Sequence, residues 1–218
     1  MIPAILQIRE VYIMNKNIIL CGVGGQGTVL ASKLIAAAAM KKDLPVMSAE
    51  TIGMAQRGGS VFSHIRIGEG LHSPMIAKST ADVILGFEPG EAVRMLPYLK
   101  DSGQVIVSSR GIMPVTAALS GTPYQSGEMI RYLKTRTDHL LVIDTDKACR
   151  ELGSSRVLNM LLLGAAIHSG ALGLTDAEIK EVIKERVPEK YHKINFRALE
   201  YTHSLKKNTL KQETYPQL

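Results

Sequence analysis

The stretch that decides the fold is Asn17-Ile18-Ile19-Leu20-Cys21-Gly22-Val23-Gly24-Gly25-Gln26-Gly27-Thr28. It opens with a short apolar run that predicts a buried strand, and its glycines then follow the G-x-G-x-x-G spacing. The residues at 29–39 are rich in Leu, Ala, Lys and Ile, which favour a helix. A strand, a tight turn and a helix in this order indicate an α/β fold.

The glycine turn also predicts a binding site. Glycine adopts positive φ easily and lets the backbone approach another group closely. The start of the following helix presents unpaired N–H groups and a positive dipole end to an anion. We therefore expect Gly22, Gly24, Gly25, Gln26 and Gly27 to bind a phosphate or a carboxylate. The alternative is that the turn serves packing alone, as in many α/β folds.

Length and composition limit the possible architectures of the chain. A chain of 218 residues with 45% hydrophobic residues is the size of one α/β domain with a helical appendage. No uncharged apolar run approaches the ~20 residues needed to span a membrane. Residues 1–16 form an expected N-terminal extension, which lacks the basic start and small-residue cleavage site of a signal peptide. We expect a cytoplasmic protein that does not bind a membrane.

The cysteines and histidines predict no metal site and no catalytic residue in this chain alone. Cys21 and Cys149 are the only cysteines, no C-x-x-C is present, and no Cys/His spacing fits a metal. No Asp or Glu lies at a short fixed spacing from His64 or His72 to form an acid–base pair. Nothing resembles an activated nucleophile.

The net charge of +6 is concentrated near the C-terminus, where residues 180–218 contain nine Lys or Arg and five Glu. The simpler interpretation is a solvated helix face followed by a basic tail at 206–218. The alternative is a binding surface for an acidic partner or a phosphorylated ligand. Nucleic acid is not expected, because no recognition motif accompanies the charge.

Hydrophobic patterns predict an alternation of strands and helices along the chain. Strands are expected at 45–49, 61–67, 81–87, 104–108 and 139–143, and helices at 88–99, 127–135, 144–152, 157–167, 175–187 and 189–206. The alternation predicts a Rossmann-like, mostly parallel sheet with helices on both faces and a C-terminal helical segment. Residues 61–67 alternate in polarity and predict an antiparallel or edge strand. The apolar run 157–167 predicts a helix buried inside the domain or against a partner. Thr175 followed by Glu178 has the spacing of a capping box and predicts the start of the helix at 175–187.

One rim of this sheet is expected to collect the unusual residues, because ligands bind at the carboxyl ends of parallel strands. Gln56, Arg57, Gly58, Gly59 and Ser60 fall there, and their backbone N–H groups, guanidinium and hydroxyl suit a phosphate or carboxylate. The alternative is a tight turn with the arginine in solvent.

Several motifs together resemble one family. They are GMAQRGGSV at 53–61, Ser73-Pro74, Phe87-Glu88-Pro89-x-Glu91-Ala92, Arg156-Val157-Leu158-Asn159, Leu162-Leu163-Gly164-Ala165 and Arg186-Val187-Pro188. With the glycine turn, they make residues 17 to about 199 similar to the gamma-type domain of 2-oxoacid:ferredoxin oxidoreductases, in particular to its indolepyruvate branch. The resemblance implies a gamma-type domain at 17–205 and a basic tail at 206–218.

The resemblance also implies a function shared with a partner. The family decarboxylates 2-oxoacids oxidatively to acyl-CoA and passes two electrons to ferredoxin. Thiamine diphosphate, Mg and 4Fe–4S clusters would belong to a large alpha subunit, and this domain would help to present coenzyme A. The isolated chain is then expected to be inactive, and to form a homodimer or a sticky monomer through the apolar surfaces of 61–67 and 157–167.

Two rival functions come from other classes. One is a free-standing NAD(P)-binding Rossmann oxidoreductase, with Glu50 on the ribose hydroxyl, since Glu50 follows Gly27 near the spacing of a dinucleotide fold. The other is a regulatory nucleotide-binding module. GMAQRGGSV at 53–61 has no place in a dinucleotide fold, and no acid–base pair follows it.

Overall fold

A computed structural model of the chain describes residues 14–50, 58–113 and 123–209. They contain a six-stranded sheet in the order β2-β3-β1-β4-β5-β6. The strands are β1 (Lys16–Val23), β2 (Val46–Glu50), β3 (Ser60–Ile67), β4 (Ala81–Gly86), β5 (Leu99–Ser108) and β6 (Leu140–Ile143). Strands β1, β4, β5 and β6 run parallel, and β3 is antiparallel to both of its neighbours. The predicted Rossmann-like, mostly parallel sheet is confirmed.

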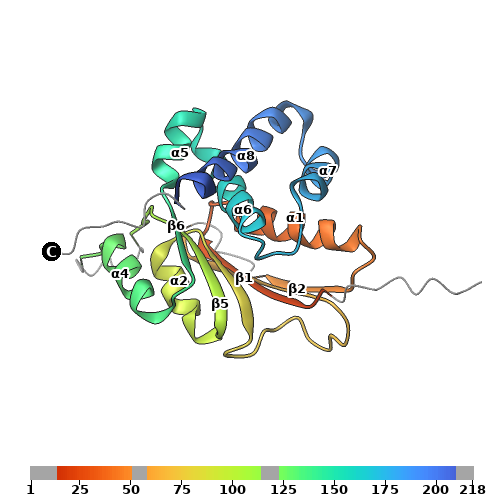
Figure 1. Cartoon of the computed structure of the whole chain (residues 1–218), viewed down its shortest axis with the longest axis horizontal. Coiled ribbons are helices and arrows are strands. Elements are labelled where there is room, and N and C mark those ends of the chain that lie inside the picture. The colour runs from red at the N-terminus through yellow and green to blue at the C-terminus, as the bar shows by residue number, and fades with distance from the viewer. Residues whose placement is uncertain (1–13, 51–57, 114–122, 210–218) are drawn as a thin grey trace, which may run out of the picture.

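Helices cover both faces of the sheet (Figure 1). One face carries α1 (Thr28–Met40), α5 (Thr145–Leu152), α6 (Leu158–His168), α7 (Asp176–Arg186) and α8 (His192–Thr209). The other carries α2 (Pro89–Met95) and α4 (Ser126–Arg136). Short 3-10 turns are η2 (Leu96–Tyr98), η3 (Ser155–Val157) and η4 (Glu189–Tyr191). None of the helices in the described ranges is long and apolar enough to cross a membrane.

The core follows from alternation along the strands. Ile18 and Leu20 of β1 face the larger helical layer, whereas Ile19 and Cys21 face α2 and α4. Helix α6 lies inside the larger layer, where every residue from Leu158 to Ile167 is buried. The apolar run at 157–167 is therefore part of the domain's own core, and the expectation that it forms a partner interface is wrong.

Three predicted boundaries needed correction. The helix expected at 88–99 ends at Met95, because Pro97 cannot continue an α-helix and the chain tightens into η2. Strand β5 begins at Leu99, earlier than the expected start at 104. Helix α8 continues to Thr209, beyond the expected end at 206, so the first residues of the supposed tail are helical. Residues 1–13 and 210–218 lie outside the described residues.

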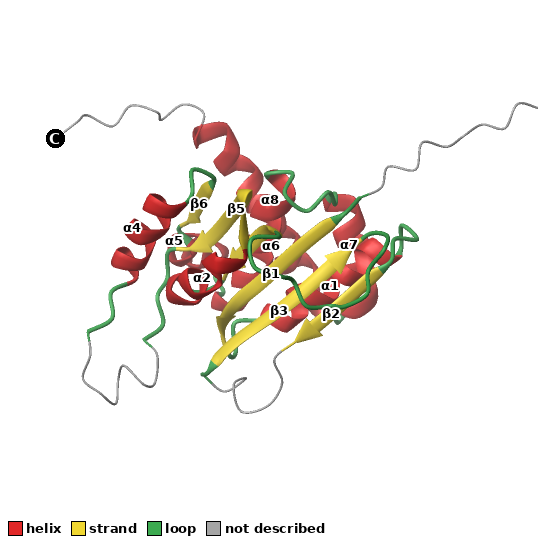
Figure 2. Cartoon of the chain, turned by 90° about the horizontal axis from the view of Figure 1, so that it is seen from below, coloured by secondary structure: helices red, strands yellow, loops and turns green. Residues whose placement is uncertain are grey.

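The position of β3 separates this fold from a dinucleotide-binding one. The alternating strand is antiparallel as predicted, but it lies between β1 and β2 and not at an edge (Figure 2). Glu50 therefore sits on the outermost strand, one strand away from the place where a dinucleotide fold holds a ribose. Its Oε1 accepts a hydrogen bond of 3.0 Å from Ser32 Oγ of α1.

The predicted capping box at the start of α7 is confirmed, and it supports a first prediction. Thr175 Oγ1 accepts from Glu178 N at 3.3 Å, and Glu178 Oε2 accepts from Thr175 N at 2.7 Å. Replacing an N-cap threonine with alanine costs about 1 kcal/mol. We expect Thr175→Ala to lower the melting temperature by roughly 2–4 °C, measured by thermal unfolding. Thr135→Ala, at an exposed residue inside α4, is the control and should leave the melting temperature within about 1 °C of wild type.

Candidate functional site

The unusual residues meet at one rim of the sheet, as predicted. Strands β1, β4, β5 and β6 end there, and Ser60, the first residue of the antiparallel β3, pairs with Val23 at the end of β1. The backbone N–H of Gly24 donates to the carbonyl of Gly59 over 2.9 Å. The two glycine stretches, far apart in the sequence, therefore form one continuous loop system. Gln56 and Arg57 lie outside the described residues.

The side chain of Gln26 holds the glycine turn in shape. Its Oε1 accepts from the backbone N–H of Val23 at 2.6 Å, and its Nε2 donates to the carbonyl of Phe87 at 2.8 Å. A Cβ placed on Gly22 would lie 2.6 Å from this Oε1 and 2.7 Å from Cβ of Phe87. Gly22 and Gln26 thus fix the turn against the β4–α2 junction, and the backbone of the other glycines faces the open side.

The N-terminus of α1 is open to a ligand. The first hydrogen bond of the helix runs from Ala31 N to Gly27 O at 3.0 Å, and no side chain caps the helix. Thr28 is 3% exposed, and its Oγ1 has no hydrogen-bond partner among the described residues. A cavity of about 500 Å³ adjoins this end, lined by Val23, Gly24, Gly25, Gly27, Thr28, Val29, Lys33 and Val61. Unpaired donors, a helix dipole and a lysine suit an anion.

A second cavity of about 490 Å³ lies on the other side of the same turn. Arg110, from the loop after β5, and Arg156, from η3, line it together with the amide of Asn159 in α6. Sequence reasoning missed Arg110 entirely and gave the other two no role, because only the tertiary fold brings them to the glycine turn. Arg110 Nε also lies 3.6 Å from Oδ1 of Asp146. The glycine turn therefore has electropositive hollows on both sides.

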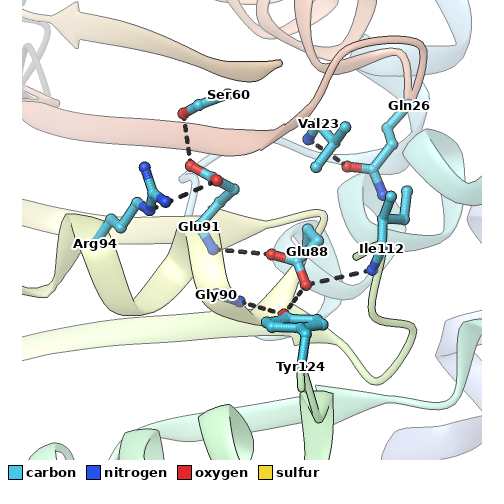
Figure 3. Close-up of polar contacts among 9 residues, drawn as sticks. All are labelled: Val23, Gln26, Ser60, Glu88, Gly90, Glu91, Arg94, Ile112 and Tyr124. Carbon is cyan, nitrogen blue, oxygen red and sulfur yellow. Dashed lines mark hydrogen bonds and ion pairs between the residues drawn. The ribbon is translucent and has the colours of Figure 1, made fainter. Parts of the chain in front are cut away.

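Glu88 organises the region beneath the turn (Figure 3). It is 1% exposed and caps α2, because its Oε2 accepts from Glu91 N at 3.0 Å. Its Oε1 accepts from the hydroxyl of Tyr124 and, over 3.5 Å, from Ile112 N. The same hydroxyl accepts from Gly90 N at 3.1 Å. One buried carboxylate thus joins α2 to the loop that carries Arg110 and to the start of α4.

Glu91 extends this network to the second glycine stretch. Ser60 Oγ donates to its Oε2 at 2.6 Å, and Arg94 Nε lies 3.7 Å from its Oε1. The hydroxyl of Ser60, predicted to face an anion, is engaged with this carboxylate. The described residues of the second glycine stretch therefore contribute backbone atoms to the rim. Ser60 anchors this backbone to Glu91.

Among the described residues, burial favours the uncharged forms of Cys21, Glu88 and His64. Burial, with some repulsion from Glu91 and Glu88, raises the pKa of the Cys21 thiol well above its usual value, so the thiol stays protonated. Burial also raises the pKa of Glu88, against the opposing effect of its hydrogen bonds from Tyr124, Glu91 and Ile112. Burial lowers the pKa of His64, whose Nδ1 accepts from Ile76 N at 3.0 Å.

The rest of the described chain adds no metal centre. In those ranges, no group of three or more His, Cys, Asp or Glu side chains is placed to hold a metal ion. His72, the other histidine considered from the sequence, is an exposed residue of the loop before β4. The described residues of the rim provide backbone donors and cations, a combination that suits an anionic group.

Comparison with known proteins identifies the family of this chain. The family described as pyruvate ferredoxin/flavodoxin oxidoreductase matches residues 17–205. The indolepyruvate oxidoreductase subunit IorB of Methanothermobacter thermautotrophicus is 38% identical over 85% of this chain and 94% of its own length. The common gamma subunit of the pyruvate/ketoisovalerate oxidoreductases of Thermococcus kodakarensis is 29% identical over 75% of this chain and 82% of its own.

A solved structure shows the same fold. It is the 2-oxoglutarate:ferredoxin oxidoreductase from Magnetococcus marinus with 2-oxoglutarate, coenzyme A and succinyl-CoA bound, which superposes with a TM-score of 0.66 at 19% identity. The match covers 89% of this chain and 31% of the other chain. The match to residues 17–205 and the identity to IorB together decide the family. This chain belongs to the pyruvate ferredoxin/flavodoxin oxidoreductase family and is a subunit of a 2-oxoacid:ferredoxin oxidoreductase.

Proposed function

We propose that this chain is the small subunit of an oxidoreductase that converts indolepyruvate and related aryl pyruvates to acyl-CoA with ferredoxin as acceptor. The observation that carries the substrate class is the 38% identity to an indolepyruvate oxidoreductase subunit, against 29% to a subunit shared by pyruvate and ketoisovalerate enzymes. The catalytic partner is a large subunit that holds thiamine diphosphate, Mg and the iron–sulfur clusters.

The rim of the sheet suits the binding of coenzyme A, which is the part of the reaction that we assign to the small subunit. The open N-terminus of α1, the unpartnered Thr28 Oγ1 and Lys33 fit a pyrophosphate group, and the cavity beside them is large enough for one. Coenzyme A carries such a group. We assign Gly24, Gly25 and Gly27 to the backbone cradle of that group, because they line the cavity. The chain would hold and orient coenzyme A while the thiol end reaches the partner's site.

The division of labour between subunits predicts that the isolated chain turns over no 2-oxoacid. The test is co-expression with the large subunit, followed by dye-linked assays with indolepyruvate, pyruvate and branched 2-oxoacids, each with and without coenzyme A. The complex is expected to prefer indolepyruvate and to need coenzyme A, and the purified small subunit is expected to be inactive.

Two results would count against this assignment. Turnover of any 2-oxoacid by the isolated chain with a viologen dye would show that catalysis resides here. A complex with higher kcat/KM for pyruvate or branched 2-oxoacids than for indolepyruvate would remove the proposed substrate class while leaving the family unchanged.

A further inference from the structure

A larger groove adjoins the anion site, between the start of α6 and the junction of α7 with α8. It encloses about 810 Å³ and shares Leu30, Arg156 and Asn159 with the second cavity at the glycine turn. Its remaining walls include Arg186 at the end of α7, Tyr191 in η4 and Asn195 in the first turns of α8. We call it the α7–α8 groove. The proposed function gives no role to the Arg156-Val157-Leu158-Asn159 and Arg186-Val187-Pro188 motifs that form it.

The groove is positively charged. Arg156, Arg186 and Lys190 line it and are exposed, and no Asp or Glu is among the described residues of its lining. Neither arginine forms an ion pair with any residue in the described ranges. An unpaired guanidinium in such a place favours a carboxylate or a phosphate, which it can bind through two parallel hydrogen bonds.

Apolar surface lies between the cations. Leu30 is 37% exposed and Tyr191 is 40% exposed, two of the few large apolar side chains of the described chain that face solvent. Val187 and Ile194 lie half-buried beside them. An aromatic and aliphatic centre with a charged rim is the usual composition of a protein-binding surface.

The apolar centre of the groove distinguishes a polypeptide from a phosphate as the occupant. A phosphate would use the cations and leave Leu30 and Tyr191 exposed, whereas a polypeptide segment covers them with an apolar side chain. Asn195 of α8, which is 9% exposed, also lines the groove. Its carboxamide can pair with both the N–H and the C=O of an extended main chain.

We propose that the α7–α8 groove binds an extended, acidic segment of a partner protein. The main chain of the segment pairs with Asn195. Its carboxylates meet Arg156, Arg186 and Lys190, and an apolar side chain between them packs on the exposed centre of the groove. The inference rests on the proposed function, in which the partner is the large subunit.

The test compares two double charge reversals in binding to the large subunit. R186E/K190E changes the groove, and R131E/K134E makes the same change in charge on the exposed surface of α4. We expect R186E/K190E to weaken the complex at least tenfold and R131E/K134E to change Kd less than twofold, because like charges facing each other across an interface are strongly unfavourable. The wild-type Kd should also rise between low and high salt, and this dependence should flatten in R186E/K190E.

Hydrogen exchange on the co-purified complex gives an independent measurement. The amides of residues 186–195 should exchange at least tenfold more slowly in the complex than in the free chain. Equal melting temperatures of the two double variants and the wild type would show that each is folded, since all four side chains are exposed.

The possible failures are distinguishable. If the wild-type chain binds no large subunit, the proposed function fails and the inference falls with it. If an active complex forms with equal Kd for both double variants and with unprotected 186–195, the groove proposal alone is overturned. If millimolar ATP or coenzyme A stabilises the free wild type thermally and R186E/K190E abolishes that shift, the groove is a small-molecule site, which also overturns the proposal.

Discussion

Glu88→Ala is expected to lower the free energy of unfolding by about 3–5 kcal/mol, the largest loss we predict for one side chain. The change removes the acceptor of three donors, namely Glu91 N, Ile112 N and the hydroxyl of Tyr124. Each buried donor left without a partner costs ~1–3 kcal/mol. The measurement is denaturant unfolding of wild type and variant, and the melting temperature should fall on the order of 10 °C.

The matched control for Glu88→Ala is Glu128→Ala. Glu128 lies in the first turn of a helix, α4, but it is exposed, and its only ion pair with a described residue is a 3.8 Å contact with the exposed Arg131. We expect Glu128→Ala to change the free energy of unfolding by no more than about 0.5 kcal/mol. Equal losses for the two variants would show that the Glu88 network does not stabilise the fold.

The pH dependence of stability gives a further measurement on the same residue. Burial raises the pKa of Glu88 in the folded state, so the folded chain holds this proton to a higher pH than the unfolded chain does. The stabilising contribution of the protonated carboxyl is present below the unfolded pKa and is lost as pH rises through the raised pKa. The wild-type melting temperature should show that decline, and Glu88→Gln should remove it. An unchanged slope in Glu88→Gln would assign the decline to other groups.

Gly27→Ala is expected to cause the second-largest effect, on both stability and coenzyme A binding. Gly27 has φ of +81°, and a Cβ there would lie 2.7 Å from Nδ2 and 3.3 Å from Cβ of Asn159. Left-handed backbone costs an L-residue about 1–2 kcal/mol, and overpacking adds about 1–3 kcal/mol. We expect a loss of about 2–4 kcal/mol in unfolding free energy and, in the assembled enzyme, a rise of at least tenfold in the KM for coenzyme A.

Gly70→Ala separates backbone strain from the effect on the site. Gly70 has φ of +69°, and a Cβ there would meet nothing within 4 Å. It lies in the loop between β3 and β4, away from the glycine turn. Gly70→Ala should lower the unfolding free energy only by the conformational cost of about 1–2 kcal/mol, and should leave the KM for coenzyme A unchanged. A coenzyme A KM that is unaffected by Gly27→Ala would remove the glycine turn from the proposed cradle.

The sequence predicted the elements whose signals are local. The apolar run and glycines at 17–28 predicted a strand, a turn and a helix, and Thr175 with Glu178 predicted the start of α7. One local signal was missed: the predicted helix at 88–99 ran through Pro97, whereas α2 ends at Met95, before this proline. Strand β3 was predicted to be an antiparallel or edge strand, but its antiparallel place between β1 and β2 depends on pairing between segments distant in the sequence.

The sequence predicted the backbone turn of the candidate site but not the side chains that line the cavities beside it. Glycine spacing carries a conformational signal, so the turn itself could be found. Arg110 and Asn159 carry no such signal, because their relation to the turn exists only after β5 and α6 have packed. Conversely, Gln26 and Ser60 were expected to face a ligand, and in the structure their side chains bond within the chain.

The position of β3 has a consequence for how the site comes into being during folding. The glycine turn follows β1, and the carbonyl of Gly59 that pairs with Gly24 arrives only with β3, after α1 and β2 have been made. A nascent chain that ends at Glu50 would contain the whole G-x-G-x-x-G signature but would lack the strand that sets the turn. Contacts between segments distant along the chain form late, because closing the intervening loop costs entropy. Anion binding should therefore appear as a late event in refolding, after the helices have formed.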